Sequence, residues 1–422
     1  MGKAQKNKIK IIKQIDLTHH FNEDVIYLFK IFENIGANLW VVGGAVRDIL
    51  LGKEYIDVDF VTDIDSKEIQ KKLSSDERFR LIDHAKMYGC ITFKSKTNSY
   101  QVTSMREDIK SYGRNADTRF TKDILVDAKR RDFTINSFYI GRQGEVLDPL
   151  GAYDDMLESK VCFIGDVRQR IEEDNLRILR FLRFAVIFNN RKISMDELQI
   201  CIQSRHLILN LSKDRVRDEV LKIISSIQSS EMIKYLSINK FFSVLNFQIT
   251  TYSYHQKISQ IKEEIDFELK PIIHFALALD PNSQNSNVMG SVEELNFAKK
   301  EFDLVRKIYN FKIIELHQFR DLIDVYLYKY GRYLTKIFLI KCLINSNIVI
   351  ADWIKLFIDI SNKPIPIFPV SAKTLKEVGF KDGKLIGKTL RELEEIWLSK
   401  KCLISDEGLL NSVDLPTDNW WK

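Results

Sequence analysis

The sequence predicts an α/β head at the N-terminus, built on a mixed sheet with helices, followed by an elongated all-helical remainder. Up to about residue 163, short apolar runs alternate with helical segments and glycine turns, which is typical of mixed α/β units. From Asp166 onward the helical period dominates and strand signals become scarce. A chain of 422 residues is long for one core, so several domains are expected. They are a basic N-terminal arm over 1–22, the head over 23–163, a helical neck over 164–235, a helical body over 236–363 and a helical tail over 364–422.

Composition and charge indicate a soluble globular protein of the cytoplasm. Hydrophobic residues make up 45% and charged residues 29% of the chain, and the net charge of +6 suits a polyanionic partner without proving one. The five cysteines lie far apart without C-x-x-C spacing, as expected for reduced thiols and not for a disulfide framework or a zinc site. The most apolar stretch, Ile337–Ile360, is interrupted by charged residues, so it predicts a buried helix pair and no membrane span.

The first elements of the head surround a pair of glycines. An amphipathic helix is expected over Asn22–Ile35, and the apolar run Leu39–Val42 suits a buried strand. Gly43–Gly44 breaks that strand and opens a short helix, Ala45–Leu51. A second strand is expected over Ile56–Thr62.

Two acids on the second strand indicate a metal site beside the glycine pair. Side chains of a strand repeat their direction every two residues, so Asp57 and Asp59 should point the same way and repel each other unless a cation lies between them. Ligands that offer only oxygen, with room for water, suit Mg²⁺. The free N–H groups of the helix that starts at Gly43–Gly44 can receive a phosphate. Either pattern alone is weak, but together at this spacing they indicate nucleotide chemistry.

The remaining elements complete the head and define the helical part. In the head we expect a helix at Ser66–Leu73, strands at Cys90–Phe93 and Tyr100–Thr103, a mobile polar loop at Arg106–Thr121, a strand or turn at Asp132–Tyr139 and a turn at Asp148–Asp155. In the helical part we expect a helix at Leu211–Ile224, amphipathic helices within Lys299–Ile344, a rigid linker at Pro364, Pro366 and Pro369, a helix at Ser371–Val378 and a last helix at Leu385–Trp397.

The pattern GGAVRD, then LG, then DVDF resembles the signature of class II nucleotidyltransferases of the polymerase-β superfamily. This family comprises the tRNA CCA-adding enzymes and bacterial poly(A) polymerases. The resemblance implies a polymerase-β-like head in which two metal ions activate an RNA 3′-hydroxyl and neutralise the leaving pyrophosphate. It implies that Gly43 and Gly44 hold the triphosphate, that Arg47 and Asp48 brace the loop, and that the catalytic acids Asp57 and Asp59 bind Mg²⁺.

A second motif, KRRDFTINS at Lys129–Ser137, resembles the RRDFTxNA motif of the family. The resemblance makes Arg131 a nucleotide contact, since an arginine pair places fixed positive charge where a triphosphate or ribose can lie. Asp132 is expected to orient one of the two arginines. Ser137 replaces the usual alanine, which is a mild change.

A third motif, EEDNLRILRFLRF at Glu172–Phe184, resembles the EDxxR helix of the family. Asp174 and Arg177 are three residues apart and are expected to share a helix face, which Arg180 and Arg183 extend. ATP and CTP each present an amino donor beside a ring-nitrogen acceptor, whereas GTP and UTP present the reversed pair. One Asp/Arg pair can therefore select A and C without a template. An ordinary salt bridge on a solvated helix is the alternative for this spacing taken alone.

Two further segments resemble the family and also depart from it. The strand QVTSMR has Gln101 where the family usually has glutamate, so Asp57 and Asp59 are left as the acids expected to bind the metal. Either these two acids suffice or the metal is held more weakly. The full-length loop that follows argues against an enzyme that adds only CC.

In the tail, Ala372 and Thr374 replace the expected glycine and aspartate, yet five lysines still offer a basic surface for phosphates: Lys373, Lys376, Lys381, Lys384 and Lys388.

The ordered motifs predict a tRNA nucleotidyltransferase that adds CCA, or its terminal A, to tRNA 3′ ends from CTP and ATP with Mg²⁺. No DNA or membrane partner is expected. A bacterial poly(A) polymerase is the nearest alternative, although its G-R-R-F-R-type segment is incomplete here. A catalytically inactive RNA-binding relative is a second alternative, which Gln101 mildly favours. The choice between full CCA and A-only addition, the oligomeric state and the tRNA contacts of the body and tail stay open at this point.

Overall fold

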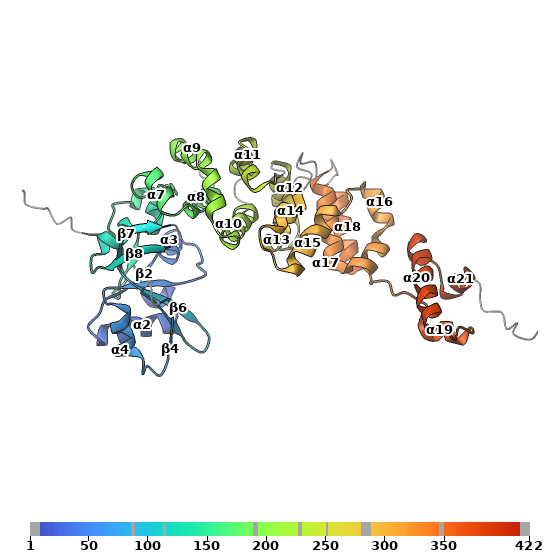
Figure 1. Ribbon diagram of the computed structural model, residues 1–422, viewed down its shortest axis with the longest axis horizontal. Coiled ribbons are helices and arrows are strands. Elements are labelled where there is room, and N and C mark those ends of the chain that lie inside the picture. Colours follow the sequence, from blue (N-terminus) through green and yellow to red (C-terminus); the bar gives the residue numbers. More distant parts are fainter. Residues whose placement is uncertain are drawn as a thin grey trace, which may run out of the picture. The chain divides into compact units, whose positions relative to one another are not determined.

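A computed structural model describes residues 9–85, 89–112, 115–188, 193–226, 230–249, 252–279, 288–345 and 350–413 (Figure 1). The chain divides into two compact units, one made of residues 1–248 and 285–297, the other of residues 249–284 and 298–422. The first unit contains the predicted head and neck, and the second contains most of the predicted body and the tail. The finer division into five segments stays a prediction.

The described part of the head is built on an eight-stranded sheet in the order β1-β10-β9-β2-β3-β6-β5-β4. Its strands are β1 (Lys10–Gln14), β2 (Leu39–Val42), β3 (Asp59–Thr62), β4 (Arg80–Ala85), β5 (Cys90–Lys94), β6 (Ser99–Ser104), β9 (Tyr139–Ile140) and β10 (Glu145–Asp148). β3 and β6 run parallel, and the other paired neighbours run antiparallel. The helices are α1 (Leu17–His20), α2 (Glu23–Asn34), α3 (Gly44–Leu50), α4 (Ser66–Leu73), α5 (Ile124–Lys129), the 3₁₀ turn η1 (Thr134–Asn136) and α6 (Tyr153–Leu157). The mixed α/β head is thereby confirmed.

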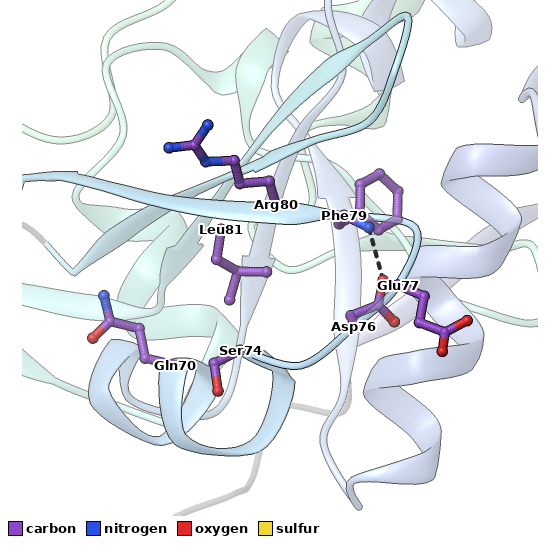
Figure 2. A pocket seen from close by; sticks show the side chains of 7 residues that line it. All are labelled: Gln70, Ser74, Asp76, Glu77, Phe79, Arg80 and Leu81. Atoms are coloured by element: carbon purple, nitrogen blue, oxygen red, sulfur yellow. Dashed lines mark hydrogen bonds between the residues drawn. The ribbon is translucent and has the colours of Figure 1, made fainter.

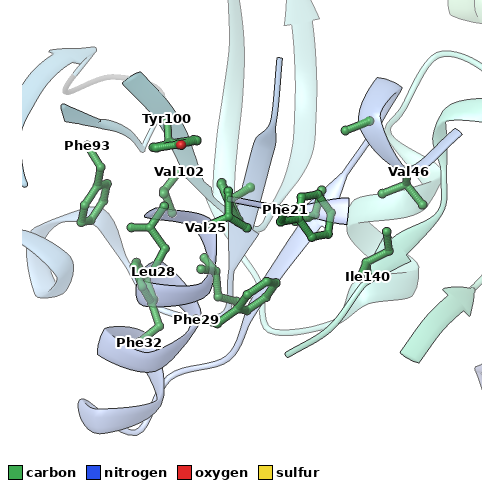
Figure 3. Packing of buried hydrophobic residues seen from close by; sticks show 14 of the residues in the cluster. Phe21, Val25, Leu28, Phe29, Phe32, Val46, Phe93, Tyr100, Val102 and Ile140 are labelled. Atoms are coloured by element: carbon green, nitrogen blue, oxygen red, sulfur yellow. The ribbon is translucent and has the colours of Figure 1, made fainter. Parts of the chain in front are cut away.

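Helix α2 covers the sheet with its apolar stripe (Figure 3). Its first turn is capped because the Asn22 side chain accepts a hydrogen bond from the Val25 amide at 3.1 Å. Four buried residues at helical spacing form the stripe, as an amphipathic helix requires: Val25, Leu28, Phe29 and Phe32. Phe32 packs on Phe93 with ring centroids 5.8 Å apart. Each such side chain contributes roughly 1.5–3 kcal/mol on burial, so this layer fixes the sheet on which the site is built.

Two expectations about the head are wrong. Residues 10–20 are not part of a basic arm, because β1 pairs with β10 at the sheet edge (Lys10 opposite Asp148) and α1 follows; residues 1–8 lie outside the described part of the chain. Charged residues are common on edge strands, so the basic sequence showed no sign of a strand here.

The polar segment Arg106–Thr121 is not a loop but a separate hairpin, β7 (Arg106–Tyr112) with β8 (Asn115–Phe120). Its residues 113 and 114 are not described. A hairpin that is not buried on one face lacks the apolar alternation that predicts a strand.

After the head, the first unit consists of short helices, most of them in the predicted neck. They are α7 (Val167–Glu173), α8 (Leu176–Ile187), α9 (Met195–Gln203), the 3₁₀ turn η2 (Arg205–Asn210), α10 (Lys213–Ser225), α11 (Ser230–Ile238), the 3₁₀ turn η3 (Phe241–Leu245) and α14 (Val288–Glu293). Helix α8 packs against α10. An aromatic cluster joins the neck to the head: Phe181 stacks on Phe163 at 5.2 Å, and Phe133 contacts Phe163 edge-on at 4.9 Å. The head and the start of the neck therefore share one core.

The second unit is helical, as predicted. Its helices are α12 (Tyr252–Glu264), α13 (Pro271–Ala278), α15 (Lys299–Asn310), α16 (Leu316–Asp321), α17 (Ile323–Ile344), α18 (Ile350–Asn362), α19 (Ala372–Glu377), α20 (Gly383–Ser399) and α21 (Asp406–Leu410). The expected last helix corresponds to α20, but α21 follows it, so that expectation is wrong. Helices α17 and α18 form the predicted buried pair, and the Trp353 Nε1 donates to the Leu339 carbonyl at 3.1 Å. Among the described helices, none has the length and apolarity needed to cross a membrane. None of the five cysteines, all of which the structure describes, forms a disulfide.

Candidate active site

Two guanidinium groups lie over the glycine turn between β2 and α3. Gly43 has φ +73° and ψ −131°, a conformation that residues with a side chain rarely adopt. A Cβ atom at Gly43 would lie 3.9 Å from the Arg131 Nη1, and one at Gly44 would lie 3.6 Å from the Arg47 Nη2. The turn is thus an open backbone surface with two fixed positive charges above it, which is suited to a polyphosphate.

The two predicted metal-binding acids lie beside this turn. Asp59 is the first residue of β3, where it pairs with Val42 of β2, directly before the glycines. Asp57 lies outside the strand and Ile56 is 96% exposed, so the expected strand start is wrong, and strand alternation does not explain how the acids meet. The acids nevertheless share one site, because desolvation and the Asp57 charge together raise the pKa of Asp59, while Arg131 lowers it.

The third position of the metal site holds a neutral side chain. Gln101 of β6 stands opposite Asp59 in the parallel β3/β6 pair. Within the described ranges, no group of three metal-binding side chains occurs. Two carboxylates facing solvent fit a divalent cation that takes its other ligands from water and substrate phosphates, which is the usual coordination of Mg²⁺. Transition metals that require nitrogen or sulfur ligands do not fit this pair.

Arg131 is held in place by a buried carboxylate that the sequence reasoning missed. Asp127, fully buried on α5, accepts hydrogen bonds from the Arg131 Nη2 at 2.9 Å and from the Arg130 Nε at 2.7 Å. The Tyr139 hydroxyl donates to the same carboxylate at 2.8 Å and accepts from the Arg131 Nε at 3.1 Å. Burial alone would raise the pKa of Asp127, but the two guanidinium groups outweigh it and hold that pKa well below its usual range. Asp127 therefore fixes the charge above Gly43.

Asp132 joins the head to the neck and does not orient the preceding arginine pair, as had been expected. Its Oδ2 accepts from the Arg180 Nε at 2.7 Å and lies 2.6 Å from the Arg180 Nη2. Its Oδ1 accepts from the Asn136 Nδ2 at 3.1 Å, and the Asn136 Oδ1 accepts from the Arg47 Nη1 at 2.9 Å. Arg47 in turn donates to both oxygens of Asp48, each at 2.9 Å. A continuous chain of polar contacts thus links the glycine turn to α8.

A second set of contacts links the arginine pair to α7. The Arg170 Nη2 donates to the backbone carbonyl oxygens of Arg130, at 2.6 Å, and of Arg131. Glu173 pairs with Arg170 and accepts from the Arg177 Nη1 at 2.7 Å. Arg177 is also tied to the Arg170 carbonyl at 2.9 Å. The predicted base-reading Arg177 is therefore already bound to the protein.

The expectation that Asp174 and Arg177 share a helix face is wrong. Asp174 ends α7 with an extended backbone (φ −151°, ψ 106°), and α8 begins only at Leu176. Its Oδ1 accepts from the Leu176 amide at 3.1 Å, so the side chain holds the first turn of the next helix, as aspartates often do at helix starts. The Arg215 Nη2, on α10, lies 3.2 Å from one oxygen and 3.0 Å from the other. Arg215 is thus the ion-pair partner of Asp174.

Arg183 contacts the neck core. Its Nε lies 3.3 Å from the Glu219 Oε2 of α10, and its guanidinium lies 4.5 Å above the Phe184 ring. Arg47 and Arg180 contact the same ring at 5.1 and 5.7 Å. Three cations around one aromatic face form cation–π contacts that join the glycine-turn helix to the neck.

The residues that sequence reasoning missed support the predicted ones: Asp127, Asn136, Arg170, Glu173 and Arg215. Asp127 had a local signal, because it lies three and four residues before the arginine pair in a helical segment. Arg215 had none, since 41 residues separate it from Asp174.

A pocket elsewhere in the head is separate from this site (Figure 2). It has a volume of about 520 Å³ and lies between α4 and β4. Its lining is Gln70, Ser74, Asp76, Glu77, Phe79, Arg80 and Leu81, which includes none of the residues around the glycine turn. The Phe79 amide donates to Asp76 at 2.8 Å across its floor.

This chain resembles known proteins whose names refer to poly A polymerases, CCA tRNA nucleotidyltransferases and CCA-adding enzymes. Residues 39–162 match the family described as the poly A polymerase head domain. The chain is 26% identical over 409 residues to the mitochondrial CCA tRNA nucleotidyltransferase 1 of Danio rerio, an alignment that covers 93% of this chain and 91% of the relative. It is 35% identical over 202 residues to the CCA-adding enzyme of Lactococcus lactis, covering 47% of this chain and 49% of the relative.

A solved structure has the same fold. The crystal structure of the Bacillus stearothermophilus CCA-adding enzyme in complex with CTP matches with a TM-score of 0.70 at 18% identity, over 90% of this chain and 93% of that chain. This likeness confirms the predicted fold class, an α/β head followed by a helical remainder.

Proposed function

We propose, from the homology of the chain to CCA-adding enzymes and its poly A polymerase head domain, that the protein is a tRNA nucleotidyltransferase. It adds CCA, or the terminal A, to tRNA 3′ ends from CTP and ATP without a template. One observation carries the site assignment: the glycine turn, Asp59 and the Arg131 guanidinium meet where the central strands β2 and β3 end. Polyphosphate binding and metal-binding acids are the two requirements of nucleotidyl transfer.

In this proposal the head performs the chemistry. Asp57 and Asp59 hold Mg²⁺, which when bound lowers the pKa of the attacking 3′-hydroxyl and neutralises the leaving pyrophosphate. The open backbone at Gly43 and Gly44 lets the triphosphate approach closely. Arg131, fixed by Asp127, stabilises the charge that develops on the phosphates.

The neck selects the base. Asp174 accepts from the exocyclic amino group of CTP or ATP, and Arg177 donates to the adjacent ring nitrogen. Both side chains already have protein partners, Arg215 and Glu173 respectively, so nucleotide binding shares or exchanges these contacts. Arg180 holds the neck against the head through Asp132, and Arg183 joins the neck helices α8 and α10 through Glu219.

The test is incorporation of each labelled nucleotide into tRNA that lacks CCA, in the presence of Mg²⁺. We expect CMP and AMP to be added and the product to stop at the CCA end. A tail of many adenylates would identify a poly(A) polymerase, which shares the head domain. Absence of incorporation at retained tRNA affinity would identify an RNA-binding relative. CTP alone, then ATP alone, separates full CCA addition from A-only addition.

We place the protein in the cytoplasm. Five cysteines without a disulfide fit a reducing compartment. The vertebrate relatives carry mitochondrial names, so a fluorescent fusion is the decisive measurement. Signal confined to an organelle would contradict this proposal.

A further inference from the structure

The body contains a pocket that combines aromatic and basic side chains. It has a volume of about 250 Å³ and lies between α15 and α17. Six residues line it: Arg306, Lys307, Asn310, Phe311, Tyr330 and Phe338. All lie in the second unit, and none belongs to the site around the glycine turn.

One wall of the pocket is aromatic. Phe311 and Phe338 stack face to face with centroids 4.0 Å apart and planes inclined by 7°. Tyr330 lies perpendicular to Phe338, with ring centroids 5.0 Å apart and planes at 87°, and it is tilted against Tyr326 at 6.2 Å. Tyr330 is nevertheless 39% exposed, so part of its ring is accessible to a ligand. The wall therefore offers a flat π surface to a partner.

The other wall is polar and positively charged. Arg306, Lys307 and Asn310 come from one turn of α15 and are exposed. Arg306 pairs with Asp303 at 2.8 Å, whereas Lys307 forms no ion pair within the residues that the structure describes. An ammonium group and an amide beside an aromatic face match the phosphate and base edge of one nucleotide.

The aromatic wall is held rigidly by the backbone of α17. Gly331 interrupts the helix directly after Tyr330 with φ +72° and ψ 170°, a conformation that is accessible to glycine alone. The Thr335 hydroxyl donates to the Gly331 carbonyl at 2.8 Å, and the Arg332 Nη2 donates to the Lys363 carbonyl at 2.8 Å. These two hydrogen bonds hold the backbone at the break, directly beside Tyr330.

Phe311 is held in a comparable way. The buried Lys341 ammonium donates to the backbone carbonyl oxygens of Ile308 at 2.7 Å, Tyr309 at 2.6 Å and Phe311 at 2.9 Å. A cation at the end of α15 compensates the unpaired carbonyls of that helix. Because both aromatic elements are preformed, a ligand does not have to order them on binding.

We propose that this pocket binds one nucleotide of the RNA substrate, with the base stacked on Tyr330, its edge on Asn310 and its phosphate on Lys307. The volume admits a single base and excludes a run of stacked bases. The inference rests on the proposed function for the identity of the RNA. It adds a tRNA-positioning contact in the body, outside the residues that read the incoming nucleotide.

The first test compares two tyrosines on either side of Gly331. We expect Tyr330→Ala to raise the KM for tRNA roughly tenfold, the effect of removing one stacked base, and Tyr330→Phe to retain the wild-type value. The kcat at saturating tRNA and the KM for CTP should not change. Tyr333→Ala is the matched control, since Tyr333 is 42% exposed but packs on Phe267 at 5.7 Å, outside the pocket.

The second test examines the charge and the source of the nucleotide. We expect Lys307→Ala to weaken tRNA binding and to lower its salt dependence, while Lys312→Ala, an exposed lysine nearby, leaves both unchanged. A photoreactive phenylalanine analogue at position 330 should crosslink to one tRNA nucleotide. A free nucleoside monophosphate also offers a base and a phosphate. Equilibrium dialysis with AMP and CMP tests whether such a free nucleotide binds to the pocket.

The outcomes separate this inference from the proposed function. An unchanged tRNA affinity for Tyr330→Ala, in a variant that melts like the wild type, overturns the pocket while incorporation continues. Free AMP bound at the pocket with an unchanged KM for tRNA also overturns it. If the wild type incorporates no nucleotide, the proposed function fails. The tRNA dissociation constants of Tyr330→Ala and Lys307→Ala then still show whether the pocket binds tRNA.

Discussion

The two sides of the predicted site differ in whether their charges are paired within the protein. The metal side is Asp57 and Asp59, and the base-reading side is Asp174 and Arg177. Asp57 and Asp59 face solvent side by side, and no described cation forms an ion pair with either of them. In the neck, by contrast, each predicted reading group has a partner: Arg177 is paired with Glu173, and Asp174 with Arg215. The acids of the metal side need a bound cation to neutralise their charge, whereas the charged groups of the base-reading side are neutralised by other side chains of the protein.

This difference has a physical consequence for each half. Uncompensated carboxylates destabilise the fold slightly but bind a cation strongly, because binding removes their mutual repulsion. Paired and partly buried charges hold their geometry in advance, so less ordering is left for the moment of binding. Under the proposed function, nucleotide selection therefore depends on preformed geometry, while catalysis depends on a cation that the substrate helps to bind.

The largest expected effect is on the metal side. We predict that Asp59→Asn lowers nucleotide incorporation by roughly a thousandfold, since metal-ion stabilisation of the transition state contributes several kcal/mol. Unfolding free energy should change by less than about 0.5 kcal/mol, because the residue is exposed and the change removes a repulsion. Incorporation kinetics and urea denaturation measure the two quantities.

Glu54→Gln is the matched control for this prediction. Glu54 is an exposed acid of the same connection between α3 and β3. Near wild-type activity in this variant, together with the loss in Asp59→Asn, assigns the effect to the metal site. An active Asp59→Asn enzyme would remove Asp59 from the catalytic residues.

The next effect concerns the buried support of Arg131. We predict that Asp127→Asn lowers the unfolding free energy by about 3–5 kcal/mol, because two largely buried guanidinium groups lose their counter-charge. Tyr139→Phe, which removes only the hydroxyl that donates to the same carboxylate, should cost about 1–2 kcal/mol. Equal losses in the two variants would show that the charge of Asp127 is not what stabilises this cluster.

The same residue predicts a pH dependence. Because the folded-state pKa of Asp127 lies below its unfolded value, its ionised form stabilises the fold above the unfolded pKa of about 3.9. That stability is lost as the pH falls through the folded-state pKa. The difference in unfolding free energy between wild type and Asp127→Asn should therefore be full at pH 7 and shrink below about pH 4.

A smaller effect is expected on the base-reading side. We predict that Arg215→Ala lowers kcat/KM for CTP and ATP about tenfold and reduces the preference for CTP over UTP, since Asp174 loses the contact that orients it. Arg217→Ala is the control, because Arg217 lies on the same helix but pairs with Asp214 and Asp218. A uniform loss for all four nucleotides would mean that Arg215 supports folding and does not orient the base-reading carboxylate.

The sequence was sufficient for the parts that rest on local patterns. The glycine turn, the apolar stripe of α2 and the helical character beyond Asp166 follow from spacing alone, and the structure has all three. The hairpin of β7 and β8 was mistaken for a loop because its pairing is not accompanied by one buried apolar face.

The errors in the site have a common cause, which is tertiary pairing. Asp174 was assigned to Arg177 because they are close in sequence, but the chain leaves the helical conformation at Asp174 and Arg215 approaches from α10. Asp132 likewise pairs with Arg180, 48 residues later, and not with the two arginines that precede it. Spacing rules apply only while one helix continues, and a single capping side chain is enough to end it.

The smallest effect tests whether the metal side lacks a ligand. Gln101 stands opposite Asp59 on the parallel strand β6, within about 5 Å as neighbouring strands are spaced. We predict that Gln101→Glu lowers the Mg²⁺ concentration for half-maximal incorporation a few-fold, since it adds a third carboxylate. The metal-free protein should lose less than about 1 kcal/mol, because like charges opposite each other on paired strands repel.

Gln143→Glu, at an exposed position in the turn between β9 and β10, adds the same charge away from the metal and should leave the Mg²⁺ dependence unchanged. If Gln101→Glu behaves like this control, two carboxylates with water and phosphate already satisfy the cation, and the neutral side chain is no deficit. If it instead lowers activity at saturating Mg²⁺, the added charge competes with the triphosphate for the space beside Asp59, and the neutral residue is what keeps that space open.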